Sequence, residues 1–123
     1  MGQATVGINW FEVPVENLGR AVDFYNAVLD TEMGEIPGPD GQPLKVFMGP
    51  QGPSGALMSG EGYTPGSHGA LIYLGCDDIN AVLGRVADAG GTVLQEHMSI
   101  GEYGAIGMFT DSEGNRIALH AES

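Results

Sequence analysis

The stretch INWFEVPVENLGRAVDFYNAVL, from Ile8 to Leu29, decides how this chain folds. Its opening part, Gly7 to Val15, is rich in β-branched and aromatic residues and predicts a strand. Asn17 is the expected N-cap of a helix, because its side chain can accept a hydrogen bond from a free first-turn amide. The apolar residues that follow recur with the period of one buried helical face; they are Leu18, Ala21, Val22, Tyr25, Val28 and Leu29.

Proline dominates the segment that follows, Gly34 to Gly66, which carries six of the seven prolines of the chain. Between them lie two short apolar runs, Leu44 to Met48 and Ala56 to Met58. Proline cannot donate a backbone hydrogen bond and interrupts helices, so this segment predicts short strands joined by hairpin loops.

The same order of elements then returns. Ala70 to Cys76 predicts a strand, Asp77 and Asp78 a cap, and Ile79, Val82, Leu83 and Val86 a second amphipathic helix that stops at Gly90 and Gly91. Three more strands are expected at 92–96, 105–110 and 116–120, with a turn at 111–115. The prediction is an α+β fold: one domain, 1–123, of two βαβββ repeats (about 5–66 and 67–121) that form a curved mixed sheet around a concave cleft.

Composition limits the classes of partner. The 123 residues include 16 acidic and 4 basic side chains, and the net charge of -12 repels phosphate backbones and anionic membrane surfaces. We therefore expect neither a nucleic acid nor a membrane partner. Cys76 is the only cysteine, which excludes an intrachain disulfide. No apolar run approaches the ~18 residues of a membrane span. A cytoplasmic location is the expectation.

Three segments carry a family resemblance: 8–29, LIYLGCDDINAVLGRVADAGG from Leu71 to Gly91, and GAIGMFTDSEGNRIALH from Gly104 to His120. Together they resemble the vicinal oxygen chelate superfamily, which includes glyoxalase I, bleomycin-resistance proteins and extradiol dioxygenases. The resemblance implies the fold and also a homodimer, since each half presents a sheet face that the other half does not fully cover. It does not imply one reaction, because this fold hosts several chemistries and also proteins that only sequester a ligand.

Metal-dependent members of that family hold a divalent ion with His and Glu side chains. Carried over by motif, the ligand positions fall at Trp10, Leu71 and Ala118, and near Met58. Tryptophan, leucine and alanine offer no donor to a metal ion, so the usual site is expected to be absent and no cofactor is predicted. A relocated site remains as an alternative, with ligands drawn from the five side chains His68, His97, His120, Glu12 and Glu96. Adjacent Glu96 and His97 would face opposite sides of a strand, which argues against it.

Strand alternation predicts that Glu12 and His120 line the cleft, two residues from Trp10 and Ala118. A carboxylate facing an imidazole can orient it as a general base, so the two are candidate catalytic residues. The alternative is a structural polar pair, or a merely solvated His120. The candidate ligand-binding residues are Trp10, Leu71, Tyr73, Tyr103, Phe109 and Ala118, in which the aromatic side chains form a wall for stacking. The alternative for these aromatic residues is the core.

Two functions therefore remain open. The first is a metal-free, resistance-type protein that binds a small organic molecule in its cleft. The second is a lyase or isomerase that uses Glu12 and His120 for proton transfer, without a metal or with a relocated one. The polarity of the cleft separates them, since sequestration needs shape and stacking whereas catalysis needs a titrating group over the substrate.

Overall fold

The computed structural model describes residues 2–4 and 7–123, so residues 5 and 6, where the first repeat was expected to begin, lie outside the described residues. The elements follow one order twice. The first unit comprises β1 (Phe11–Pro14), α1 (Leu18–Val28), β2 (Gly34–Pro37), β3 (Pro43–Gly49) and β4 (Gly52–Met58). The second comprises β5 (Ile72–Gly75), α2 (Ile79–Leu83), α3 (Val86–Ala89), β6 (Thr92–Ser99), the 3-10 helix η1 (Gly101–Tyr103), β7 (Ala105–Thr110) and β8 (Arg116–Ala121). The predicted α+β fold with a duplicated βαβββ unit is confirmed.

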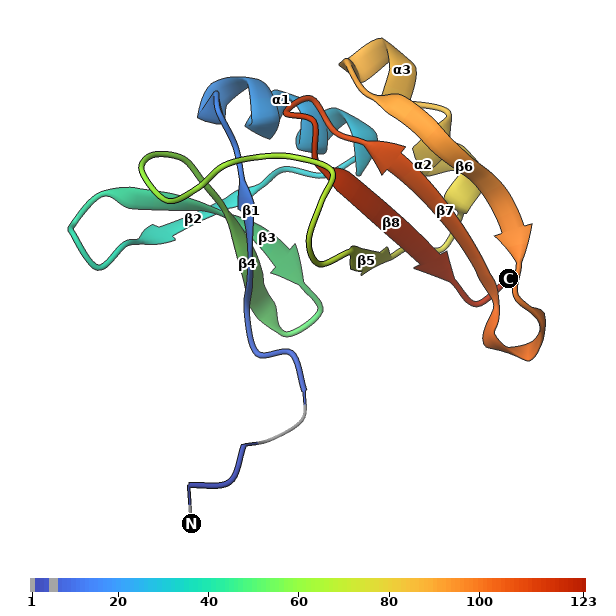
Figure 1. Cartoon of the computed structure of the whole chain (residues 1–123), viewed down its shortest axis with the longest axis horizontal. Coiled ribbons are helices and arrows are strands. Elements are labelled where there is room, and N and C mark those ends of the chain that lie inside the picture. The colour runs from blue at the N-terminus through green and yellow to red at the C-terminus, as the bar shows by residue number, and fades with distance from the viewer. Residues whose placement is uncertain (1, 5–6) are drawn as a thin grey trace.

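Each unit forms its own four-stranded mixed sheet, with the order β1-β4-β3-β2 in the first and β5-β8-β7-β6 in the second. The first strand of each unit pairs in parallel with the last, and the remaining pairs are antiparallel. The two sheets stand side by side, and the helices lie together along one side of them (Figure 1). Within the described residues the helices lie on this one side, so the other face of each sheet carries no helix (Figure 1).

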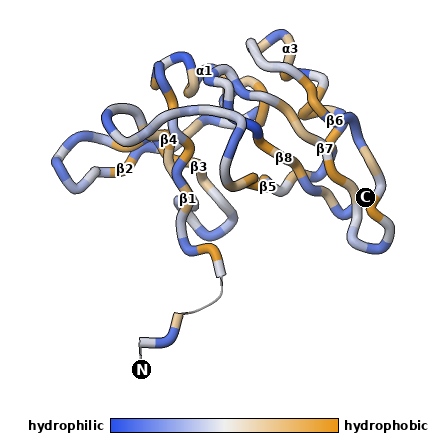
Figure 2. The backbone as a smooth tube through the Cα atoms, in the orientation of Figure 1, coloured by the Kyte–Doolittle hydropathy of each residue, from blue (hydrophilic) through white to orange (hydrophobic). Residues whose placement is uncertain are grey.

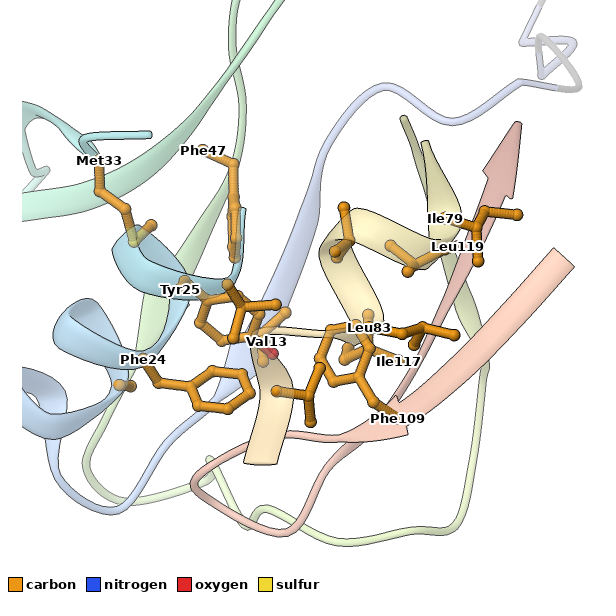
Figure 3. Close-up of a cluster of buried hydrophobic side chains, with 14 of the residues drawn as sticks. Val13, Phe24, Tyr25, Met33, Phe47, Ile79, Leu83, Phe109, Ile117 and Leu119 are labelled. Atoms are coloured by element: carbon orange, nitrogen blue, oxygen red, sulfur yellow. The ribbon is translucent and has the colours of Figure 1, made fainter. Parts of the chain in front are cut away.

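The core lies on the helix side of both sheets. Val13 and Phe47 of the first sheet pack with Tyr25 of α1, and Phe109 of the second sheet meets Phe24 with ring centroids 5.9 Å apart. Figure 3 shows these α1 side chains meeting those of the second unit. Apolar residues follow the strands of both sheets, whereas turns such as the β2–β3 hairpin are more polar (Figure 2). One continuous core therefore joins the two units.

The helices differ between the units. The predicted caps are confirmed, since Asn17 accepts from the amide of Arg20 and Asp78 from that of Ala81. The single second helix predicted from Ile79 to a stop at Gly90 and Gly91 is wrong, because the chain leaves the helix after Leu83, at Gly84, and resumes in α3. Glycine loses more conformational freedom in a helix than other residues, so a break there costs little. No helix within the described part of the chain is long and apolar enough to cross a membrane.

A turn at 111–115 ties the units together beside this core. Asn115 donates from Nδ2 to the carbonyl of Pro14 at 2.7 Å, and its Oδ1 accepts from the amide of Gly66 at 3.0 Å. The Glu113 carboxylate accepts from the amides of Glu16 and Asn17, each at 2.9 Å. The turn thus fixes β1, the start of α1 and the β4–β5 connection against the second sheet.

Candidate ligand-binding site

Glu12 organises the open face of the first sheet. Side chains of β1 point alternately to the core and to the open face. Val13 is buried in the core, whereas Glu12 is exposed. The Trp10 indole Nε1 donates to Glu12 Oε2 at 3.4 Å, and the Tyr63 hydroxyl donates to Glu12 Oε1 at 2.9 Å. The bond to Glu12 raises the pKa of Tyr63 above its ordinary value. As expected, Trp10 and Glu12 share one face, and Tyr63 joins them from the β4–β5 connection.

A pocket of about 410 Å³ lies between the two units. We call it the inter-unit pocket. It opens between β1, the β4–β5 connection and the first residues of β5 and β8. Its aliphatic wall is formed by Val13, Pro14, Pro65, Ala70, Ile72 and Ile117. Its polar lining consists of Glu12, Thr64, His68, Asn115 and Arg116, with the backbone of Gly66. A mostly aliphatic wall with a few polar groups is the usual lining of a small-molecule site.

Arg116 is the unusual member of this lining. It opens β8, and its Nε atom is buried without a hydrogen-bond partner among the described residues. The side chain as a whole is half-buried, so Nε is shielded from water while the terminal nitrogens of the guanidinium stay accessible. Asn115, next to it, is fully bonded through the turn, so its amide cannot move to relieve Arg116.

His120 lies away from the pocket, at the other end of β8. It lies four positions beyond Arg116, or about 13 Å along a strand. Its Nε2 lies 2.6 Å from the carbonyl oxygen of Tyr103, with which it makes a hydrogen bond. Glu12 bonds instead to Trp10 and Tyr63. The structure therefore does not bring Glu12 and His120 together within one chain, although both side chains belong to open faces.

The other predicted ligand-binding residues divide into two groups. Tyr73 pairs with Ala118 across β5 and β8, on the face opposite the core residues Ile117 and Leu119, and Tyr73 is half exposed. Leu71 precedes β5 with the same orientation by alternation. Tyr103, in η1, is the most exposed of the aromatic side chains named above. Phe109 lies instead in the core against Phe24, fully buried, so it forms no part of an open wall.

The residues at the family's ligand positions do not fit a divalent metal ion. Trp10, Leu71 and Ala118 have no donor atom, and the Met58 thioether is a soft ligand unsuited to such a site. Among residues 2–4 and 7–123, no group of three His, Cys, Asp or Glu side chains is arranged to hold a metal ion.

Cys76 is not an activated nucleophile. Burial raises the pKa of its thiol, and the charges of Asp77 and Asp78 add to this rise against a backbone hydrogen bond that lowers it. A thiol with a raised pKa carries little thiolate at neutral pH.

Several lining residues of the inter-unit pocket, such as His68 and Arg116, were not among the predicted site residues. Arg116 had a signal in the sequence, because it precedes Ala118 by two residues on a strand and so shares its open face. His68 and Thr64 had none, since they lie in an irregular connection without any period.

The family model for the Glyoxalase/Bleomycin resistance protein/Dioxygenase superfamily matches residues 7–119. No protein of curated function matches the chain significantly.

Three solved structures show the same fold. One is TnmS3, described as an antibiotic binding protein from Streptomyces sp. CB03234, with 27% identity, a TM-score of 0.65, and coverage of 98% of this chain and 99% of the other. A second, a glyoxalase/bleomycin resistance protein from the same organism, has 29% identity, a TM-score of 0.66 and coverage of 90% and 96%. A third, a glyoxalase/bleomycin resistance protein from Albidiferax ferrireducens, has 19% identity, a TM-score of 0.67 and coverage of 93% and 97%.

Proposed function

Because the chain belongs to the glyoxalase/bleomycin resistance/dioxygenase superfamily, we propose that it is a metal-independent binding protein for a small organic molecule. The ligand would occupy the inter-unit pocket and extend over the adjoining open face around Trp10 and Tyr73. The observation that carries the proposal is the pocket itself, which combines a volume of about 410 Å³ with an aliphatic wall and five polar side chains.

Two further observations support sequestration over catalysis. The ligand positions of the metal-dependent relatives carry Trp10, Leu71 and Ala118, none of which has a metal-donor atom; Trp10 and Leu71 are accessible for contact, whereas Ala118 is buried. The two candidate catalytic side chains, Glu12 and His120, are bonded to other groups and do not meet in the chain. TnmS3, with 27% identity over nearly its whole length, is an antibiotic binding protein, which makes antibiotic-like molecules the first class to test.

The proposal includes a homodimer. Large apolar side chains remain exposed on both units: Ile8, Trp10 and Met48 in the first, and Tyr73, Leu94, Met98, Ile100 and Tyr103 in the second. Exposed apolar side chains of this size are the groups that a second molecule covers where they form a continuous patch. A second copy of the chain could cover this surface without any other protein. In such a homodimer the open sheet faces would close over the ligand. Light scattering that gives the 12.8 kDa mass of a single chain at micromolar concentration would contradict the dimer.

Trp10 makes the binding proposal directly testable, because it is the only tryptophan of the chain. A thermal-shift screen of antibiotic-like natural products should find compounds that raise the melting temperature, since a ligand that binds only the folded state stabilises it. The same compounds should change Trp10 fluorescence at saturation. Chelation with EDTA should leave both effects intact, and elemental analysis should find less than stoichiometric metal. A metal requirement for binding, or catalytic turnover of the compounds that bind, would contradict the proposal.

A further inference from the structure

The inter-unit pocket contains an unsatisfied cation in a strongly acidic protein. The chain has only four lysine and arginine residues against 16 aspartate and glutamate residues. Arg20 pairs with Glu113 and Lys45 with Glu35, and Arg85 donates from Nε to the carbonyl of Val28 at 3.0 Å. Arg116 is the exception, because its buried Nε has no acceptor among the described residues.

The stability of the fold does not explain why Arg116 lacks an acidic partner. Carboxylates outnumber cations four to one in the chain, so an ion pair for Arg116 would be easy to supply. The burial is confined to Nε, because the side chain as a whole is only half-buried, so the terminal nitrogens of the guanidinium are open to a molecule that supplies acceptors. A guanidinium presents its N–H donors as a planar fork, which matches two oxygens of a carboxylate or phosphate.

The surroundings of Arg116 suit an anion with an apolar body. His68, at the same pocket, offers an imidazole ring as a second hydrogen-bond donor, and Ile72 and Ile117 provide an aliphatic wall. Glu12, the acidic residue of the lining, already accepts hydrogen bonds from Trp10 and Tyr63. The net charge of -12 acts over longer distances, which salt screens beyond about 8 Å at physiological ionic strength. The local contact with Arg116 therefore decides the preference.

We infer that the ligand of the inter-unit pocket is a small organic anion, a carboxylate or a phosphate ester, whose charged group is bound by Arg116 and whose apolar body lies against Ile72 and Ile117. This inference rests on the proposed binding function and assigns the chemical class of its ligand. It also makes Arg116, the last residue of the closing DSEGNR run, the residue that determines specificity.

Four probes test the inference on the full-length protein by calorimetric titration: benzoate, its neutral isostere benzamide, phenyl phosphate and inorganic phosphate. Benzoate or phenyl phosphate should bind about tenfold more tightly than benzamide, as expected for one charge-assisted contact. The better of the two identifies the carboxylate or the phosphate ester as the natural group. Either organic anion should also bind more tightly than inorganic phosphate, because the aliphatic wall contributes only to the organic probes.

Substitutions test whether Arg116 causes the preference for the anion over its neutral isostere. Arg116→Gln should remove the tenfold difference between benzoate and benzamide, and Arg116→Lys, which keeps the charge but loses the fork, should retain only part of it. Lys45→Gln is the matched control: it removes one positive charge from the first sheet, away from the pocket, and should keep the full preference. If Arg116→Gln fails to fold, Arg116→Lys still decides the question, since an unchanged preference there would contradict a role for the guanidinium fork.

The outcomes separate this inference from the proposed function. Equal binding of benzoate and benzamide, or a preference that survives in Arg116→Gln, would overturn the anion assignment. Neutral compounds from the natural-product screen that bind independently of Arg116 would do the same while leaving the binding function in place. Failure of every probe in this panel to bind would overturn the anion assignment, whereas failure of the natural-product screen would overturn the binding function itself.

Discussion

Both units of this duplicated fold end in a hairpin, but the two hairpins differ in which parts of the molecule their turns contact. In the first unit, the turn between β3 and β4 spans residues 49–52, and the hydrogen bond beside it is local, from Ser54 Oγ to the carbonyl of Phe47 at 3.2 Å. In the second unit, the turn between β7 and β8 spans residues 111–115, and its side chains reach β1, α1 and the β4–β5 connection.

The difference lies in three polar side chains of the second turn. Asp111 accepts from the turn amides of Glu113 and Asn115, which fixes the backbone of the turn. Held in this way, Glu113 accepts two bonds from Arg20, at 2.7 and 2.9 Å, and Asn115 bonds to Pro14. A tight turn therefore serves as the polar link between two units, and it also fixes one rim of the inter-unit pocket through Asn115.

Glu113, whose side chain is fully buried, is the residue of the second turn at which a substitution should have the largest effect. Glu113→Ala removes the acceptor for Arg20 and for the amides of Glu16 and Asn17. We expect the free energy of unfolding to fall by about 2–4 kcal/mol, because several donors lose their partner together. Chemical denaturation measures this change.

The matched control is Glu35→Gln, which breaks the Glu35–Lys45 pair within the first sheet, where the Glu35 side chain is 51% exposed. Exposed ion pairs contribute little, so this variant should change stability by less than about 1 kcal/mol. Equal losses in the two variants would show that the 111–115 turn has no special role.

Acid should weaken the same link. The hydrogen bonds from Arg20, and further bonds from Asn17, Ser112 and Glu16, lower the pKa of Glu113 from 4.5 to about 2. A carboxyl with a lowered pKa in the folded state contributes stability above its unfolded value, and loses it as the pH falls from about 4.5 towards 2. The stability of the wild type should therefore fall more steeply over this window than that of Glu113→Gln, as measured by denaturation at each pH. Parallel curves would contradict the assignment.

Much of this fold could be predicted from sequence because its signals are local. The Asn17 and Asp78 caps, the turn at 111–115 and the alternation in β1 and β8 each depend on neighbouring residues, and each is as expected. The break at Gly84 was missed because the apolar spacing of Ile79, Val82, Leu83 and Val86 continues across it. A period shows which face is buried but not whether the backbone stays helical.

The site was less predictable, because it depends on contacts between distant segments. β7 reads AIGMFT, with apolar residues on both faces, so alternation could not assign Phe109 to the core. The pocket needs the β4–β5 connection, whose Gly- and Pro-rich sequence has no period. Alternation also gave the faces of Glu12 and His120 but not their positions along two separate sheets, which is why the structure does not bring them together.

A smaller effect is expected at Tyr25, which joins α1 to the second turn. Its hydroxyl donates to Asp111 Oδ2, and burial together with the charge and hydrogen bond of Asp111 raises the pKa of Tyr25 well above its ordinary value. Tyr25→Phe keeps the ring contacts with Phe24 and Phe47 but removes this donor. Stability should fall by about 1–2 kcal/mol, since Asp111 keeps its bond from Asn115. Thermal denaturation at neutral pH measures the loss, and a melting temperature equal to that of the wild type would contradict this role.

The smallest loss of stability is expected in the β3–β4 hairpin of the first unit. Ser54→Ala removes a single hydrogen bond to the Phe47 carbonyl within the β3–β4 hairpin, where the serine is only partly buried. The loss should be about 0.5–1 kcal/mol, the net contribution of one such bond. Because this bond reaches no other unit and shares no partner with Glu113, the double variant Ser54→Ala, Glu113→Ala should lose the sum of the two single losses, as expected for independent sites. A departure from additivity beyond about 0.5 kcal/mol would show that the first hairpin also takes part in joining the units.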